Sequence, residues 1–513
     1  MKTDTILILD YGSQYNQLIA RSVRENNVFC LVVPPETDIK EIRSIAPKGI
    51  ILSGGPLSVY EKNAPKLNPE ISDLKIPILG ICYGMQLLAR QMKGAVKGTR
   101  KREYGRSPLV IDDKSDLFKD LPRRIISWMS HGDYVSRLPK NFKRLAHTKN
   151  TAIAAMRSSD KLFYGVQFHP EVKHTEMGSK IIANFLFTIC GCRRNWTIKS
   201  FINESIASLK KEVKKELVIL GLSGGVDSSV CALLLHRSIG KRLWCIFVDN
   251  GLLRKGEAER VKKVFQKHYK MNLKVVRAED EFLKRLKDVT DPEEKRKIIG
   301  KTFIRVFERE SRKLGKVKYL AQGTLYPDVI ESRSAFGGPS ATIKTHHNVG
   351  GLPEKMGLKL LEPLKYLFKD EVRKLGESLN MPHELIWRQP FPGPGLGVRI
   401  LGEVTKERLN MLQEADHVVI DHAKKNNIYY DVWQCFAVLV PIRTVGVMGD
   451  KRTYENLVAI RAVTSKDGMT ADWAKLPYKF LETVSNRIVN EVKGVNRVVY
   501  DISSKPPATI EWE

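Results

Sequence analysis

The sequence contains no apolar run of the roughly 18–20 residues that a transmembrane helix needs. Its first residues, MKTDTILILDYGSQ, also lack the basic start, the long apolar core and the small-residue cleavage site of a secretory signal peptide. We interpret this stretch as the first buried strand of the fold. We therefore expect a cytoplasmic protein without a membrane partner.

Cysteine is scarce, with seven residues scattered through a chain of 513. An odd number at irregular spacing does not indicate a disulfide framework. Cys190 and Cys192 are close enough to suggest metal ligands, but no second Cys/His pair stands at zinc-finger spacing to complete four ligands. We expect no zinc, and we interpret these two cysteines as small apolar residues at a helix end.

A long basic block is also missing, although the formal net charge is +29. Proteins that bind nucleic acid concentrate Lys and Arg on one stripe or patch, whereas here the excess is spread along the chain. We therefore expect no nucleic-acid partner. The same positive field would attract small anionic substrates such as nucleotides.

The length and the rhythm of apolar runs predict three domains, because a chain of this size exceeds a single core. Strands, turns and helices alternate in residues 1–195 and again in 196–388, which predicts two doubly wound α/β domains. The polar stretch at 191–200 and the Pro/Gly-rich stretch at 388–403 mark the boundaries. Residues 389–513 group strands around one helix, which indicates a small α+β domain.

The stretch LGICYGMQ places Cys82 between two glycines at a strand-to-helix junction. Gly80 and Gly84 allow a sharp backbone turn, as in the nucleophile elbow of hydrolases. The helix N-terminus favours the thiolate, and its backbone N–H groups can bind an oxyanion. We therefore interpret Cys82 as a nucleophile, although a buried cysteine more often serves only packing.

A thiol nucleophile needs a base, and the stretch QFHPE supplies His169 and Glu171. We expect both side chains on one face of an extended strand, since they are two residues apart. Histidine can accept the thiol proton while glutamate orients the imidazole. The Gly54-Gly55-Pro56 turn could bring a second oxyanion donor to the same sheet edge.

The stretch SGGVDSS follows a predicted buried strand and opens a predicted helix. Backbone N–H groups of such a loop wrap a phosphate, and the helix N-terminus adds positive potential. The Walker A spacing is missing: IIGKT at 298–302 mimics the end of that motif, but Lys295 stands where its first glycine is required. We interpret this second stretch as helix surface.

Residues 5–190 resemble the class I glutamine amidotransferases, through the G-x-C-x-G-x-Q pattern and the distant H-P-E. The resemblance implies a flavodoxin-like α/β domain in which Cys82 attacks the side-chain amide of glutamine. A glutamyl thioester forms and ammonia leaves, with His169 and Glu171 in the other triad roles. It also implies that the backbone at Gly55 and Tyr83 donates to the oxyanion.

The glycine loop resembles that of the N-type ATP pyrophosphatases, which have an adenine-nucleotide α-hydrolase-like fold. These enzymes cleave ATP between its α and β phosphates and adenylate an oxygen that a nucleophile then displaces. Asp227 is the expected Mg²⁺ ligand, because magnesium takes carboxylate and phosphate oxygens. No organic cofactor is expected. The residues expected to bind ATP are Ser223, Gly224, Gly225, Val226, Asp227, Ser228 and Ser229.

The domain order, FPGPGLGVRILGE and the final KPPATIEWE closely resemble the glutamine-hydrolysing GMP synthetase family over essentially the whole chain. The resemblance implies glutamine, ATP and XMP as substrates: ATP adenylates O2 of the xanthine, and ammonia replaces AMP at C2. It also implies a homodimer through the third domain, which completes the XMP site.

The same resemblance assigns further residues. Those expected at the nucleotide site and in its lid are Asp328, Glu331, Arg333, Lys344, His346 and His347. Lys505 and Glu511 match tail positions that contact XMP, and Arg399 and Arg443 are weaker phosphate candidates for which a strand-surface role is the alternative.

Two other enzyme classes share such a glycine loop and are the alternatives to GMP synthesis. NAD synthetases share the glycine loop but usually carry a nitrilase-like glutaminase, which does not fit the residues around Cys82. RNA-modifying enzymes also use such loops, but they predict an RNA-binding module and often a cysteine pair that carries sulfur, and the sequence has neither. A scaffold without activity does not fit a chain that keeps both complete motifs. We expect XMP and ATP to stimulate the glutaminase.

Overall fold

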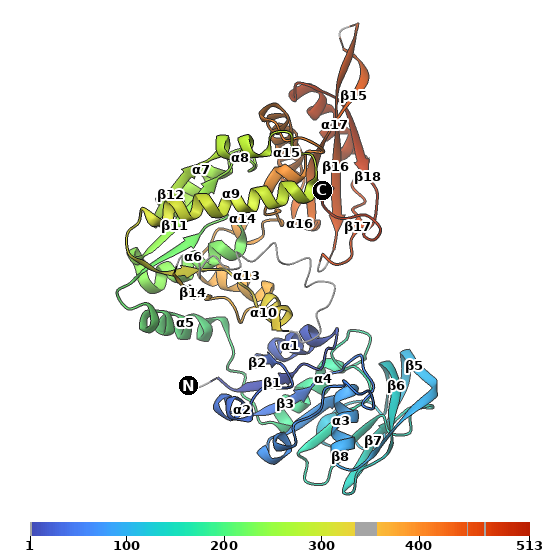
Figure 1. Ribbon diagram of the computed structural model, residues 1–513. Coiled ribbons are helices and arrows are strands. Elements are labelled where there is room, and N and C mark those ends of the chain that lie inside the picture. The colour runs from blue at the N-terminus through green and yellow to red at the C-terminus, as the bar shows by residue number, and fades with distance from the viewer. Residues whose placement is uncertain (1–2, 334–356, 449, 466–467) are drawn as a thin grey trace. The chain divides into compact units, whose positions relative to one another are not determined.

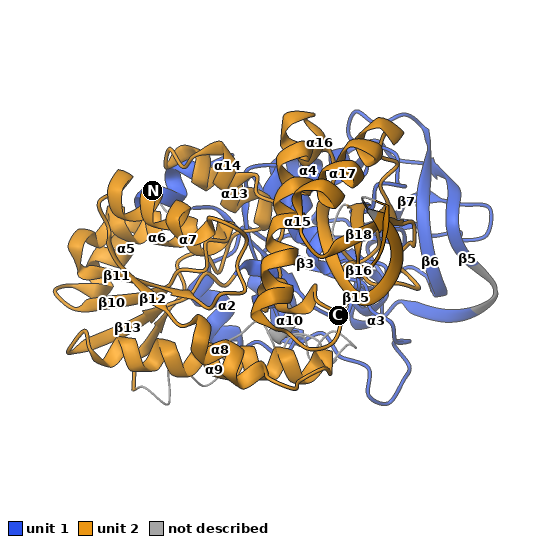
Figure 2. Cartoon of the chain, turned by 90° about the horizontal axis from the view of Figure 1, so that it is seen from above, with its two compact units in different colours: residues 1–203, 325–343 blue, residues 204–324, 344–513 orange. Residues whose placement is uncertain are grey.

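The computed structural model describes residues 3–333, 357–448, 450–465 and 468–513 (Figure 1). The chain forms two compact units, coloured separately in Figure 2. The described residues of the first unit fall within 1–203 and 325–343, and those of the second within 204–324 and 344–513. Within the described ranges, no helix is both long enough and apolar enough to cross a membrane.

Unit 1 is built on a nine-stranded sheet with the order β2-β1-β3-β4-β9-β8-β7-β5-β6. Its strands are β1 (Thr5–Leu9), β2 (Phe29–Val33), β3 (Gly49–Leu52), β4 (Ile78–Ile81), β5 (Ala95–Ile111), β6 (Arg124–Arg137), β7 (Phe142–His147), β8 (Ala155–Ser158) and β9 (Phe163–Val166). Its helices are α1 (Asn16–Glu25), α2 (Ile39–Ile45), α3 (Tyr83–Gln91), α4 (Gly178–Ala183) with the π-helix Asn184–Ile189, and α10 (Tyr326–Arg333). Helix α5 (Ile198–Val213) crosses into unit 2.

The parallel half of this sheet forms from short apolar runs. Every residue of β3 and β4 is buried, as expected for parallel strands covered on both faces. The prediction of a mostly parallel sheet holds for β2-β1-β3-β4-β9 only. Strands β8, β7, β5 and β6 continue the sheet by antiparallel pairing, and the long β5–β6 hairpin forms its edge (Figure 1).

Unit 2 begins with a five-stranded parallel sheet of order β12-β11-β10-β13-β14. Its strands are β10 (Leu217–Gly221), β11 (Leu243–Asp249), β12 (Asn272–Arg277), β13 (Val317–Ala321) and β14 (Lys359–Leu361). The helices of this part are α6 (Val226–Ile239), α7 (Glu257–Val261), α8 (Glu279–Leu286), α9 (Pro292–Arg312), α13 (Lys369–Ser378) and α14 (His383–Ile386). The second doubly wound fold is therefore confirmed, and IIGKT lies in α9, as predicted.

The last part of unit 2 is a smaller sheet with helices against it. Its strands are β15 (Gln434–Met448), β16 (Lys451–Thr464), β17 (Asp472–Trp473) and β18 (Val495–Asp501), and its helices are α15 (Lys406–Lys425), α16 (Ile428–Asp431) and α17 (Tyr478–Glu491). Strands β15, β16 and β18 and helix α17 agree with the predicted strands around one helix, whereas β17 was not predicted. The prediction of a single helix was wrong, because α15 begins at a Thr405 cap that accepts from the Arg408 N–H and buries one apolar face.

The core of unit 2 runs through both of its sheets. One hydrophobic cluster contains Ile219 and Ile246 of the parallel sheet together with Leu409 of α15, Ile460 of β16 and Val484 of α17. The division of the chain at residues 195 and 388 stays a prediction. In terms of packing, residues on both sides of 388 share one core.

Candidate functional site

Cys82 occupies the tight turn between β4 and α3, with φ 51° and ψ −104°. The flanking glycines make this turn sterically feasible. A Cβ on Gly80 would lie 2.5 Å from the carbonyl carbon of Gly84, and one on Gly84 would lie 2.4 Å from the Leu52 carbonyl oxygen. The strand–turn–helix geometry expected around the cysteine is therefore present, with its unusual backbone held in place by close packing.

The structure brings Cys82, His169 and Glu171 together. His169 contacts the Cys82 thiol through its side chain, and its Nδ1 lies 2.7 Å from Glu171 Oε1. Both Cys82 and His169 are buried, 5% and 4% exposed. Burial alone lowers the pKa of His169, but the Glu171 carboxylate and the Cys82 sulfur outweigh it and raise that pKa well above its ordinary value.

The segment that carries this pair differs from the prediction. Strand β9 ends at Val166, so His169 and Glu171 do not lie on an extended strand. Pro170 between them lacks the N–H that a ladder position would need. The His169 N–H donates to the Trp128 carbonyl at 3.0 Å, and the Thr175 hydroxyl donates to the His169 carbonyl at 2.6 Å. The two side chains meet through this loop geometry instead.

Strand β6 and the segment after β9 supply contacts around the thiol that the sequence analysis did not identify. The Cys82 thiol donates to the Ser130 carbonyl at 3.7 Å, and Gln167 Nε2 donates to Cys82 Sγ at 3.6 Å. Gln86 Nε2 donates to the Asp133 carbonyl at 2.8 Å. Gln86 was visible in the G-x-C-x-G-x-Q pattern, but no local signal links Cys82 to a hairpin about 50 residues away.

Gly55 and Tyr83, the predicted oxyanion donors, lie beside each other. A Cβ on Gly55 would be 3.2 Å from the Tyr83 ring and 2.7 Å from the Tyr11 carbonyl oxygen. Tyr83 is the first residue of α3, whose leading N–H groups have no partner within the helix. The limited space at position 55 suits a glycine, and the N–H groups at the start of α3 lie beside Cys82.

The glycine loop of unit 2 joins β10 to the N-terminus of α6. Gly224 has φ 73°, a conformation that favours glycine. The Ser223 and Ser228 hydroxyls lie 2.9 Å apart, and the Gly225 N–H donates to Ser223 Oγ at 3.3 Å. Ser223 is exposed, whereas Ser229 is fully buried. The loop therefore presents hydroxyl and N–H groups at a helix N-terminus, as phosphate binding requires.

Two cationic side chains contact this loop that the sequence analysis missed. Lys369 Nζ, at the start of α13, lies 2.5 Å from both carboxylate oxygens of Asp227. Arg388 Nη1 donates to the Gly224 carbonyl at 2.9 Å and pairs with the buried Glu257 at 2.6 Å. Both residues are more than 140 positions from the loop, so only the fold reveals them.

Lys505 and Glu511, the C-terminal residues predicted to contact XMP, have partners inside unit 2. Arg399 donates through Nε and Nη2 to the two carboxylate oxygens of Glu511 at 2.9 and 2.8 Å. Arg399 is fully buried and its guanidinium lies 3.8 Å from the centre of the Phe436 ring, so a strand-surface role does not fit it. Lys505 Nζ donates to the Gly468 carbonyl at 2.9 Å. Arg443 is exposed on β15.

The predicted residues of the nucleotide site and lid are only partly described. The carboxylate of Asp328 accepts from the Leu325 N–H at 3.2 Å, at the first turn of α10. The backbone of α10 extends through Glu331 and Arg333. The predicted lid residues Lys344, His346 and His347 lie outside the described residues.

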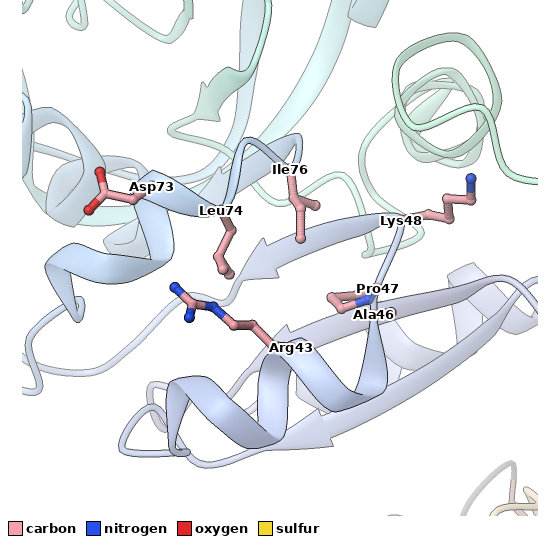
Figure 3. A pocket seen from close by; sticks show the side chains of 7 residues that line it. All are labelled: Arg43, Ala46, Pro47, Lys48, Asp73, Leu74 and Ile76. Atoms are coloured by element: carbon pink, nitrogen blue, oxygen red, sulfur yellow. The ribbon is translucent and has the colours of Figure 1, made fainter.

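A surface depression of unit 1 lies away from the thiol. It is lined by Arg43, Ala46, Pro47, Lys48, Asp73, Leu74 and Ile76 (Figure 3). Lys48 and Ile76 precede the parallel strands β3 and β4, whereas Cys82 follows β4. The depression therefore lies at the opposite sheet edge from the thiol, and none of the predicted site residues lines it.

Three family models match consecutive parts of the chain. "Glutamine amidotransferase class-I" matches residues 7–189, "NAD synthase" matches 198–297 and "GMP synthase C terminal domain" matches 398–512. Each of the first two models contains one of the sites described above, the thiol site and the glycine loop.

Curated relatives match over the full length. The chain is 56% identical over 513 residues to "GMP synthase [glutamine-hydrolyzing]" of Clostridium botulinum (strain Loch Maree / Type A3), with 100% of both chains covered. It is 57% identical over 508 residues to the protein of the same name from Carboxydothermus hydrogenoformans, with 99% of both chains covered. The chain belongs to the family of glutamine-hydrolysing GMP synthases.

Proposed function

We propose that this chain makes GMP from XMP with glutamine as the nitrogen donor, through a thiol site in unit 1 and an ATP site in unit 2. The observation that carries the proposal is the buried Cys82–His169–Glu171 arrangement in a chain that matches glutamine-hydrolysing GMP synthases from end to end. The enzyme is a ligase that forms a C–N bond. The residue roles that follow are part of the proposal.

In the thiol site, Cys82 attacks the side-chain carbonyl carbon of glutamine. His169 receives the thiol proton and gives it to the departing amine, so that ammonia leaves and a glutamyl thioester remains. The backbone N–H groups of Gly55 and Tyr83 stabilise the oxyanion that forms on the carbonyl oxygen. Water, deprotonated by His169, then hydrolyses the thioester to glutamate. Glu171 supports these steps because its charge stabilises the imidazolium.

In the ATP site, the loop Ser223–Ser229 binds the β and γ phosphates, which leave as pyrophosphate. The xanthine O2 of XMP attacks the α phosphate and becomes adenylated. Ammonia then displaces AMP at C2, which gives GMP. Lys369 supports this assignment, since an ammonium beside the loop can neutralise the charge that develops on the leaving pyrophosphate.

Asp227 is the residue that would hold Mg²⁺ here. Mg²⁺ is usually bound through one or two carboxylates plus substrate phosphates and water, and the described loop offers one carboxylate beside hydroxyl groups. The donor set therefore fits the ion. Bound Mg²⁺ would supply charge neutralisation on the ATP phosphates. Asp227 meanwhile holds the Lys369 ammonium beside the loop.

XMP is proposed to bind in the third predicted domain, beside the last residues of the chain. Arg399, Glu511 and Lys505 supply the charged groups: the cations suit the phosphate and the carboxylate suits purine N–H groups. Asp328, Glu331, Arg333 and the lid residues Lys344, His346 and His347 are carried over from the family resemblance. Domains at 1–195, 196–388 and 389–513 belong to the same proposal, as does stimulation of the glutaminase by XMP and ATP.

A homodimer through the third domain is also proposed. Its support comes from the hairpin of β15 and β16, which Figure 1 shows as two long paired strands. The side chains of Ile442, Val445, Val447 and Tyr454 on this hairpin are 63%, 53%, 72% and 56% exposed. A second copy would bury this surface. We place the enzyme in the cytoplasm, in line with seven free cysteines and with the substrates. Sedimentation of Val447→Glu, which we expect to be monomeric, tests the dimer.

The test of the proposed function is one assay with two nitrogen sources. Protein, Mg-ATP and XMP are incubated with either glutamine or ammonium, and GMP and AMP are measured by chromatography. We expect GMP and AMP in equal amounts from both. Cys82→Ala should lose only the glutamine-fed reaction, with Cys192→Ala, another buried cysteine, as the matched control. AMP without GMP would mean that the acceptor is wrong.

The match of residues 198–297 to the NAD synthase model makes a second acceptor worth including in the same assay. Nicotinic acid adenine dinucleotide replaces XMP in a parallel tube. We expect no amidated product from it, since residues 398–512 match the C-terminal domain of GMP synthase. Amidation of this acceptor, but not of XMP, would replace the proposed function with NAD synthesis.

A further inference from the structure

The last residues of the chain are docked on unit 2 by buried side chains at several points. Glu511 lies on Arg399, and the Thr509 carbonyl accepts from Arg461 Nη2 at 3.1 Å. Trp512 Nε1 donates to Asp501 Oδ2 at 2.9 Å. Arg399 and Arg461 are both fully buried. Residues 509–513, here called the tail, therefore cover two arginines that would otherwise lack these partners.

The end of the tail meets a lysine that the site described so far does not use. Lys295, in the first turn of α9, is fully buried. Its Nζ donates to the Ile400 carbonyl at 2.8 Å and forms an ion pair with the side chain of Glu513. The Gly402 N–H donates to the other side-chain carboxylate oxygen of Glu513 at 3.1 Å, and Arg296 Nη2 donates to a backbone oxygen of Glu513.

Lys295 and Arg399 bind the tail side by side, because the backbone next to Arg399 also holds Lys295. Ile400, whose carbonyl holds the lysine, directly follows Arg399, which holds Glu511. A shift of the tail by one residue would therefore break both ion pairs at once. Glu511 and Glu513 are two residues apart, and each pairs with its own buried cation. Together the two pairs fix both the position and the register of the tail.

The energetics favour a strong attachment. A buried ammonium without an anionic partner is costly, so removing one member of such a pair is far more disruptive than removing a pair at the surface. Burial lowers the pKa of Lys295, while Glu513 opposes that shift. Because the tail itself covers Lys295, release of the tail exposes the ammonium to water, and docking depends on the pair with Glu513.

We propose that Lys295 is a positioning residue, which binds Glu513 and thereby holds Glu511 on Arg399 so that the tail is ordered before XMP arrives. This inference rests on the proposed function, in which the tail forms part of the XMP site. It assigns a role to the lysine that breaks the Walker A spacing at position 295.

The proposal predicts a specific kinetic pattern. If only a fraction of molecules has a docked tail, the apparent dissociation constant for XMP is the intrinsic value divided by that fraction, while XMP at saturation restores the docked state. Lys295→Met, which keeps length and apolar volume, should therefore raise KM for XMP at least about tenfold with little change in kcat. Lys295→Arg should restore most of the wild-type KM. Glutaminase activity without XMP should not change.

The experiment combines the KM and kcat measurements for XMP with a second measurement that needs no substrate. Hydrogen exchange, followed by mass spectrometry of peptides covering residues 503–513, reports tail docking in the free full-length protein. We expect several-fold faster exchange in Lys295→Met and in Glu513→Gln. The double variant should resemble either single variant, because both remove the same ion pair. Lys297→Met, at an exposed position of the same helix, is the matched control.

Three results would overturn the proposal. The first is wild-type exchange of the tail in both single variants. The second is faster exchange with KM for XMP unchanged, and the third is additive effects in the double variant. Should Lys295→Met fail to fold, Glu513→Gln carries the same test from the tail side. If the wild-type protein makes no GMP, the proposed function fails, whereas the exchange data still decide whether the pair holds the tail.

Discussion

Replacing Glu171 by Gln tests the catalytic reasoning most directly, because it removes one charge and keeps the shape of the side chain. Glu171 Oε1 lies 2.7 Å from His169 Nδ1, and the Glu171 side chain is inaccessible to solvent. The carboxylate is the main group that raises the pKa of His169 against the effect of burial. The amide oxygen of Gln can still accept from Nδ1–H, so the imidazole keeps its orientation.

The expected magnitude follows from Coulomb's law. Two unit charges about 4 Å apart interact by about 4 kcal/mol at an effective dielectric constant of about 20. The dipole of the Gln amide retains part of this stabilisation of the imidazolium. We therefore expect kcat/KM for glutamine hydrolysis to fall by about 10²- to 10³-fold, since each 1.36 kcal/mol corresponds to about tenfold in rate.

The assay measures glutamate released at saturating XMP and ATP from pH 6 to about 10. In the wild-type protein the raised pKa keeps His169 protonated, and able to give its proton to the leaving amine, up to high pH. In Glu171→Gln that pKa falls, so the alkaline limb of the profile should move to lower pH. GMP synthesis fed by ammonium should not change.

Glu176→Gln is the matched control, because Glu176 lies on the same loop but accepts from the Ile126 N–H rather than from His169. The reasoning fails if Glu171→Gln keeps glutaminase activity within about threefold of wild type and shows the same alkaline limb. A parallel loss of the ammonium-fed reaction would instead indicate general damage to the fold, which the thermal unfolding midpoint would reveal.

The remaining predictions concern packing, the ATP site and acid stability. Gly84→Ala should lower the melting temperature and abolish glutamine hydrolysis, since its Cβ would overlap a carbonyl; Gly300→Ala, in a helix with open space around it, should be neutral or raise stability by up to about 1 kcal/mol in thermal unfolding. Lys369→Met should reduce ammonium-fed GMP formation at least about tenfold and leave glutamine hydrolysis without XMP intact, measured by chromatography of AMP and glutamate. Although burial alone raises the pKa of Glu103, the His131 ring, whose Nε2 lies 3.5 Å from Oε2, and hydrogen bonds from Thr151 and Thr148 lower it to about 2. The Glu103 carboxylate therefore adds stability above about pH 4.5, and this stability is lost as the pH falls toward 2, so Glu103→Gln should flatten the acid limb of an unfolding curve followed by circular dichroism.

The parts of the site that the sequence predicted are those in which neighbours along the chain determine the geometry. Gly80, Cys82 and Gly84 are successive residues of one turn, so their spacing alone indicates the elbow. The strand before the glycine loop and helix α6 after it follow from the same local logic. The α/β class was predictable because apolar runs such as β3 and β4 are buried on both faces.

Other residues were invisible because their partners are far away in the sequence. Lys369 reaches Asp227 across 142 positions, and Lys295 reaches Glu513 across 218. Nothing around either lysine distinguishes it from the many surface lysines of a chain with 86 basic residues. His169 and Glu171 were paired correctly, yet for the wrong reason, since a proline-containing loop and not a strand brings them together.

The two sites face opposite electrostatic tasks, and their buried charges differ accordingly. At the thiol, the stabilised species is a cation, so the charge buried beside His169 is the carboxylate of Glu171. In unit 2 the proposed ligands are anions, and the buried or loop-facing groups are the cations Lys369, Arg388 and Arg399, each held by a carboxylate. In the absence of a ligand, those carboxylates hold the cations in place. The free-energy cost of burying each cation is then lower than it would be for an unpaired cation. A phosphate that binds must compete with Asp227, Glu257 or Glu511 for its cation. The affinity for phosphate at each position therefore depends on how firmly the carboxylate is held. For Glu511, we assign to Lys295 the function of holding the tail that carries this carboxylate.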